Sequence, residues 1–130
     1  MKVAVSGYFL IYHAGHEEYL RRAKARADYL VVILNNDKQQ ILKYGKVIVS
    51  MKQRYDVLKS VKYVDEIFIS IDEDETVNQS LKFLNPDIFA KGGDRDITNI
   101  PEKKVCNEMG IVIADGMGSK IQSSSDLLKL

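Results

Sequence analysis

The sequence predicts a single α/β domain with a Rossmann-like, doubly wound sheet of five mainly parallel strands. Two observations support this fold class. Short apolar, β-branched runs recur along the 130 residues, and segments whose apolar side chains repeat at helical spacing separate them. Strands and helices that alternate in this way favour parallel pairing through right-handed helical crossovers. The length suits one compact core, so we expect one domain over residues 1–130.

The strands are expected in short runs that begin soon after the N-terminus. The run from Tyr29 to Leu34 is apolar throughout, which is typical of a strand that is covered on both faces. The five expected strands are Val3 to Ser6, Tyr29 to Leu34, Glu66 to Ile71, Asp87 to Ala90 and Ile111 to Ala114.

The expected helices lie between these runs. The first carries an apolar stripe at Tyr19, Leu20, Ala23 and Ala27. The other helices are expected from local start and stop signals. Ser50 and Gln53 are spaced as in a capping box at the start of the second helix, and Asn85-Pro86 is expected to end the third. Pro101 suits the first turn of the fourth, and a Ser-rich segment precedes the last. These four helices are expected around Met51 to Val61, Val77 to Leu84, Pro101 to Met109 and Ser123 to Leu130, with residues 40–49 as a loop.

Composition excludes several classes of function. Nineteen basic and eighteen acidic residues leave a net charge of +1, which disfavours a nucleic-acid partner. The apolar runs are too short to span a membrane, and no secretory leader is recognised. The single cysteine, Cys106, has no partner for an internal disulfide, in keeping with a reducing compartment. We therefore expect a cytoplasmic protein that binds neither membrane nor nucleic acid.

Polar, mostly glycine-bearing clusters follow four of the expected strands. In open α/β sheets, ligands bind beyond the carboxyl ends of the strands, so these clusters are expected to meet at one site. The clusters are Tyr8 to His16, Asn35 to Asp37, Lys91 to Asp94 and Asp115 to Ser125.

The segment His13-Ala14-Gly15-His16 is the most informative of these clusters. It lies where a strand gives way to a helix, and the free N–H groups of a helix N-terminus attract phosphate. Two imidazoles three residues apart can face one ligand, and Gly15 lets the backbone approach it. They could also be ordinary loop histidines. A zinc site is disfavoured because Cys106 is a poor further ligand, so no metal ligand is predicted in the protein.

Several motifs also carry a resemblance to a known family. The stretch from Gly7 to His16 resembles the signature of the cytidylyltransferase-like nucleotidyltransferases. The Lys91-Gly92-Gly93-Asp94 cluster resembles the heptose-phosphate adenylyltransferase branch, and glycerol-phosphate cytidylyltransferases share much of the pattern. The segment from Ser123 to Leu128 resembles the C-terminal phosphate-binding motif, and Arg54 also fits. The resemblance extends from Lys2 to Leu128 and implies one nucleotidyltransferase domain.

The resemblance implies a reaction and a set of site residues. A phosphorylated substrate would attack the α-phosphorus of a nucleoside triphosphate whose phosphates carry Mg²⁺, and pyrophosphate would leave. His13 and His16 would contact the phosphates, and either Lys43 or Lys46 would be the catalytic lysine of a mobile loop. Members are commonly dimeric, so a homodimer is expected. The residues implied in nucleotide binding are Gly7, Tyr8, Phe9, Gly15, Arg54, Lys91, Gly92, Gly93, Asp94, Ser123 and Ser124.

Two departures from the family pattern bear on the substrate. Leu10 stands where many members carry an acidic residue, and Gly118 stands where cytidylyltransferases commonly carry an arginine. The second departure favours ATP over CTP. We therefore expect an adenylyltransferase acting on a small phosphorylated substrate, with a sugar phosphate of lipopolysaccharide biosynthesis as the leading acceptor. The alternatives are a glycerol-phosphate type of cytidylyltransferase, a flavin-nucleotide-forming relative, and a nucleotide-binding module without catalysis.

Overall fold

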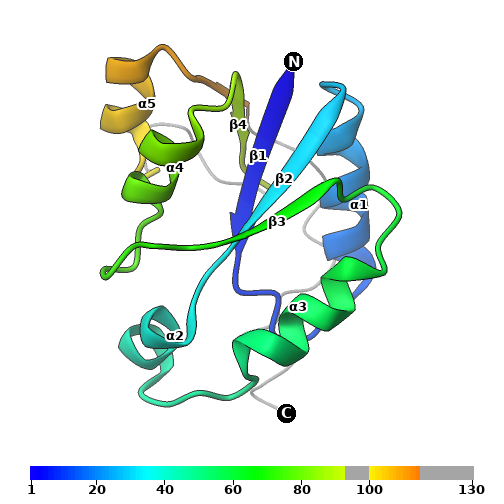
Figure 1. Cartoon of the computed structure of the whole chain (residues 1–130), viewed down its shortest axis with the longest axis vertical. Coiled ribbons are helices and arrows are strands. Elements are labelled where there is room, and N and C mark those ends of the chain that lie inside the picture. The colour runs from blue at the N-terminus through cyan, green and yellow to red at the C-terminus, as the bar shows by residue number, and fades with distance from the viewer. Residues whose placement is uncertain (93–99, 115–130) are drawn as a thin grey trace.

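The fold is built on one parallel sheet. The computed structural model describes residues 1–92 and 100–114. Its five strands lie in the order β3-β2-β1-β4-β5, and every neighbouring pair is parallel (Figure 1). The Rossmann-like α/β fold is therefore confirmed. The strands are β1 (Lys2–Gly7), β2 (Tyr29–Leu34), β3 (Glu66–Ile69), β4 (Ile88–Ala90) and β5 (Val112–Ala114).

Helices cover both faces of this sheet. Alternate residues of β1 face opposite sides, so Val3 and Val5 pack with α1 and α3, whereas Ala4 packs with α4 and α5. In the described part of the chain, no helix is both long and apolar enough to cross a membrane. The helices are α1 (Ala14–Lys24), α2 (Asp37–Tyr44), α3 (Met51–Lys59), α4 (Asn78–Leu84) and α5 (Lys103–Met109).

Register brings the carboxyl ends of the central strands together. Gly7 at the end of β1 is the partner of Leu34 at the end of β2, and the N–H of Asn35 then donates to the carbonyl of Gly7 at 3.0 Å. On the other side of β1, Ala4 is the partner of Phe89 in β4. The loops after β1, β2 and β4 therefore leave the sheet side by side.

Helix α2 corrects the expectation of a loop over residues 40–49. Asn36 caps the helix by accepting from the N–H of Gln39, the side chain of Gln39 accepts from the N–H of Asn36, and Gly45 ends the helix in the left-handed region at φ 81°. The residues that α2 buries are Gln39 and Gln40, both fully inaccessible, so it lacks the apolar stripe that signals a helix.

The other helix boundaries follow the sequence closely. Ser50 caps α3 by accepting from the N–H of Gln53, but the expected capping box is not complete, because the side chain of Gln53 accepts from the hydroxyl of Ser50 and not from its N–H. Asn85 ends α4 in the left-handed region at φ 45°. Pro101 lies in the turn before α5, which begins two residues later at Lys103. The helix expected over 123–130 lies outside the described residues.

The turn after β1 depends on a close contact between Gly7 and Phe9. Phe9 adopts a left-handed backbone at φ 50°, which costs a non-glycine residue energy, and its ring folds back over Gly7. A Cβ on Gly7 would lie 2.8 Å from that ring. Phe9 is only 5% exposed, so the contact fixes how the chain leaves β1 toward α1.

We expect Gly7→Ala to lower the free energy of unfolding by about 1–3 kcal/mol, because the added methyl group overpacks against the Phe9 ring. Urea unfolding measures this change. A Phe9→Leu background removes the ring and is expected to make the same alanine substitution cost less. An equal cost of Gly7→Ala in both backgrounds would contradict the contact.

Candidate active site

The site forms at the carboxyl ends of β1, β2 and β4. In Figure 1, β1 and β2 run downward side by side, and the chain continues from β2 into α2. Three of the four predicted clusters follow these strands, as the rule for open α/β sheets requires. Asp94, Gly93, Ser123 and Ser124 lie outside the described residues, so their predicted roles stay predictions.

Hydrogen bonds and ring stacking hold His13 and His16 in place at the start of α1. Nδ1 of His13 accepts from the N–H of Gly15 at 3.0 Å, and Nδ1 of His16 accepts from the N–H of His13 at 3.3 Å. This is a capping box made of two imidazoles, whose rings stack with centroids 3.9 Å apart. Each Nδ1 is an acceptor, so in the neutral ring the proton lies on Nε2. Both rings therefore offer an Nε2–H donor.

Burial keeps both histidines neutral. It lowers the pKa of His16 to about 4, with His13 adding to the effect, and it lowers the pKa of His13 below its usual value. The ring of Phe9 lies 4.9 Å from that of His16 and supplies part of this apolar cover. Nε2 of His13 is itself buried and has no partner in the described part of the chain. An unpartnered, buried donor is costly, and a bound acceptor would relieve that cost.

The side chain of Arg54 is buried and hydrogen-bonded on several sides at the carboxyl ends of β1 and β2. It is 1% exposed, and its guanidinium donates to three backbone carbonyls: Nη1 to Tyr8 at 2.9 Å and to Asn35 at 2.6 Å, and Nε to Val49 at 2.9 Å. Its Nη2 forms an ion pair with Asp37 at 2.9 Å. The side chain therefore joins the ends of β1 and β2 to the first turns of α2 and α3.

This arrangement changes the role expected for Arg54. The sequence predicted a guanidinium within reach of phosphate in the first turn of a helix, and the helix placement is correct. However, Arg54 is buried, and protein acceptors engage four of its five N–H bonds. In the described structure this side chain holds the ends of β1 and β2 in place, and its contact with nucleotide stays a prediction.

The two candidate lysines have different surroundings. Lys43 lies in the last turn of α2, with its Nζ 4.8 Å from the ring centre of Tyr8 and 5.4 Å from that of Tyr44. Lys46 follows the helix, is exposed as Lys43 is, and forms no hydrogen bond, ion pair or ring contact with the described residues. Tyr8 directly follows β1, so Lys43 is the lysine that the structure attaches to the end of the central strand.

The cluster after β4 lies across β1 from α2. Nζ of Lys91 donates to the hydroxyl of Ser6 at 3.3 Å, which holds this lysine beside β1. A Cβ on Gly92 would lie 3.1 Å from the ring of Tyr19, whose hydroxyl donates to the carbonyl of Ala90 at 2.6 Å. The glycine therefore lets the loop pack closely against α1.

Sequence reasoning missed the two glutamines of α2. Gln39 donates to the carbonyls of Asp74 and Thr76 at 2.8 Å each, and so ties α2 to the loop after β3. Gln40 accepts from the N–H of Ile48 at 2.6 Å and donates to the carbonyl of Val49 at 2.8 Å. The capping pattern of Asn36 and Gln39, with Gly45 after it, was the available signal.

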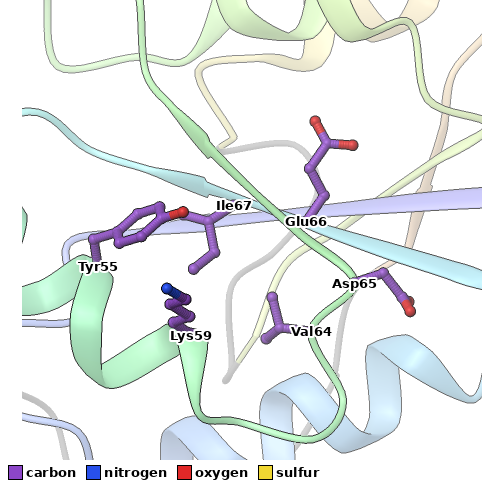
Figure 2. Close-up of a pocket in the computed structure, with 6 residues that line it drawn as sticks. All are labelled: Tyr55, Lys59, Val64, Asp65, Glu66 and Ile67. Carbon is purple, nitrogen blue, oxygen red and sulfur yellow. The ribbon is translucent and has the colours of Figure 1, made fainter.

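A groove outside this site is lined by none of the predicted site residues. It has a volume of about 290 Å³ and lies between the end of α3 and the start of β3, at the sheet edge (Figure 2). Glu66 pairs with Val31 near the start of β2, so the groove lies toward the amino ends of the strands. Its lining residues are Tyr55, Lys59, Val64, Asp65, Glu66 and Ile67.

Comparison with known proteins gives the family of this chain. Residues 4–117 match the Cytidylyltransferase-like family, so the chain belongs to that family. It is similar to a FAD synthase of Thermococcus sibiricus, with 36% identity over 99% of this chain and 90% of that protein.

Two further similarities point to the same family. The bifunctional protein HldE of Helicobacter pylori is 42% identical over 71% of this chain, which spans only 20% of that protein. The crystal structure of a lipopolysaccharide core biosynthesis protein from Thermoplasma volcanium matches with a TM-score of 0.71 and 27% identity, over 89% of this chain and 93% of that one. The expected family and enzyme class are therefore confirmed.

We expect the free energy of unfolding to fall as pH drops from about 6.5 toward 4. The folded state holds His16 neutral, whereas the unfolded chain takes up the proton below its ordinary pKa of 6.5. A shift of this size corresponds to about 3 kcal/mol. Urea unfolding at several pH values measures it. His16→Gln keeps an acceptor at the cap and should flatten this part of the profile; an unchanged slope would contradict a neutral, buried His16.

We expect Arg54→Met to lower the free energy of unfolding by about 3–5 kcal/mol, because three carbonyls and Asp37 lose their donor. Arg54→Lys keeps the charge and is expected to cost less. Arg22→Met, on the exposed face of α1, is the control and should change stability by under about 0.5 kcal/mol. Equal urea midpoints for Arg54→Met and Arg22→Met would show that Arg54 does not join these elements.

Proposed function

We propose that this chain transfers the adenylyl group of ATP to the phosphate of a small acceptor and releases pyrophosphate. The observation that carries the proposal is the pair of neutral imidazoles at the start of α1, whose Nε2–H groups are not used by the capping box. Similarity to FAD synthases supports adenylyl transfer, because FAD is FMN whose phosphate carries an adenylyl group. The departure at Gly118 also favours ATP over CTP.

The proposed step is a direct displacement at phosphorus. An oxygen of the acceptor phosphate forms a bond to the α-phosphorus of ATP, the bond from that phosphorus to the α,β-bridging oxygen breaks, and pyrophosphate carries away the electron pair. Negative charge grows on the phosphate oxygens as this happens. The Nε2–H donors of His13 and His16 and the N-terminus of α1 would stabilise it without having to reorganise. No covalent intermediate with the protein is involved.

Mg²⁺ enters this proposal as part of the substrate. Among the described residues, no group of three or more His, Cys, Asp or Glu side chains could hold a metal ion. In the proposed reaction the ion is bound to the triphosphate, where it neutralises charge on the phosphates. The remaining task of the protein is to position the two phosphates, through the histidines, Lys43 and the loop after β4.

FMN is the first acceptor to test. The FAD synthase of Thermococcus sibiricus matches along nearly the whole of both chains, whereas the HldE match covers 71% of this one. The sugar phosphate favoured by the sequence motifs is the second candidate, supported by HldE and by the lipopolysaccharide core biosynthesis protein of similar structure.

The deciding experiment supplies the purified protein with MgATP or MgCTP and either FMN or a set of sugar phosphates. Pyrophosphate release and the mass of the product are the readouts. We expect release only when ATP and an acceptor are both present, with FAD as the product from FMN. Turnover with CTP but not with ATP would mean that a cytidylyl group is transferred instead of an adenylyl group, and the reaction class would stand. Absence of turnover with every pair would contradict the proposal.

We expect His13→Asn to lower kcat by about 10²–10³-fold, because it removes one donor to the transition state. Asparagine is also a strong N-cap residue, so the helix start is retained and the free energy of unfolding should change by less than about 1 kcal/mol. His13→Ala is the matched comparison, since it loses the cap as well as the donor. Wild-type kcat in a stable His13→Asn protein would contradict the catalytic role.

A further inference from the structure

The ammonium group of Lys43, an exposed residue, lies close to two aromatic rings. Its Nζ lies 4.8 Å from the ring centre of Tyr8 and 5.4 Å from that of Tyr44, within the range of cation–π attraction. The rings meet edge to face, with centroids 5.8 Å apart and an interplanar angle of 83°. We call this arrangement the Tyr8–Tyr44 cage.

The cage is attached to the rigid part of the site. The carbonyl of Tyr8 accepts from Nη1 of Arg54 at 2.9 Å, so the residue is fixed at the end of β1. Tyr44 is the last residue of α2, whose first turn Asp37 ties to the same guanidinium. Because both rings stand on elements joined by Arg54, they hold the lysine at a defined place on the edge where the phosphates would lie.

The attraction depends on a neutral ring. Burial, with the nearby carboxylate of Glu75 and the Tyr44 ring adding to it, raises the pKa of Tyr8 to about 12 and outweighs the opposing effect of Arg54. Tyr8 therefore stays a phenol at neutral pH, and its π face, rather than a phenolate charge, attracts Lys43. Phenylalanine at this position would keep most of the interaction, whereas leucine would not.

We propose that Tyr8 and Tyr44 are positioning residues that order Lys43 for the triphosphate of the nucleotide, and that Lys43 rather than Lys46 is the functional lysine. The inference rests on the proposed function and names its phosphate-binding cation. A free lysine side chain has many rotamers, and ordering it at the moment of binding weakens binding. The cage orders it beforehand, so that the nucleotide meets a cation already at the site.

The experiment compares Tyr8→Leu, Tyr8→Phe and Tyr44→Leu with the wild-type protein. Tyr8→Leu leaves the carbonyl that Arg54 uses, so thermal unfolding should show a folded protein. Calorimetry measures MgATP affinity, and steady-state assays measure kcat and KM for ATP. We expect Tyr8→Leu to weaken MgATP binding by about three- to tenfold, Tyr8→Phe to restore it, and Tyr44→Leu to have a smaller effect because its ring lies farther away.

A cycle with Lys43→Met isolates the role of the cage. In the Lys43→Met background, Tyr8→Leu should have no further effect on MgATP affinity. Tyr29→Leu is the matched control, because Lys2 lies 5.6 Å from that ring at the start of β1 and β2, away from the site. Its MgATP affinity should equal that of the wild-type protein.

Separate results would overturn the cage and the function. If Tyr8→Leu costs the same with and without Lys43, or if Lys46→Met rather than Lys43→Met weakens binding, the cage has no positioning role although transfer still occurs. If the wild-type protein binds no MgATP, the proposed function itself fails and the inference with it. Proton NMR also checks the cage directly: ring currents should shift the Lys43 side-chain signals in the wild-type protein, and the shift should be smaller in Tyr8→Leu, where only the Tyr44 ring remains.

Discussion

The buried guanidinium of Arg54 is the interaction on which the candidate site depends. Parallel strands end with backbone carbonyls that have no partner in the sheet, and in this protein one arginine from α3 satisfies those of Tyr8 and Asn35. The same group pairs with Asp37 at the start of α2. A charge buried this deeply is stable only while its partners stay in place, so it couples four elements at the edge of the sheet where the candidate site lies.

Local packing next to these elements determines the protonation state of His13 and His16. The contact between Gly7 and Phe9 turns the chain out of β1, and the Phe9 ring then covers His16. Burial removes the charge from the imidazoles, and the capping box fixes the nitrogen that carries the proton. A donor of known orientation therefore follows from a glycine, an aromatic ring and a helix start. Folding therefore sets the orientation of these donors before any ligand binds, which the proposed role toward phosphate requires.

The sequence predicted the sheet and the position of the histidine pair at the start of a helix, because each leaves a local pattern. Continuous apolar runs mark the strands, and a glycine between two histidines marks the helix start. It could not predict α2 from periodicity, because that helix buries Gln39 and Gln40 instead of an apolar stripe. Nor could the sequence show that Arg54 is buried. Its acceptors include the backbone carbonyls of Tyr8 and Asn35, and every residue has such a carbonyl, so the residue types do not reveal the contact.

The most direct test of this account is nitrogen NMR of the two histidine rings across a pH series, before and after MgATP is added. The account predicts neutral rings at pH 7 with the proton on Nε2 in both, and a change in the Nε2–H signals when the triphosphate binds. Charged rings at pH 7, or protons on Nδ1, would contradict a capping box in which each Nδ1 accepts a hydrogen bond. Nε2–H signals that ignore saturating MgATP would contradict their role toward phosphate.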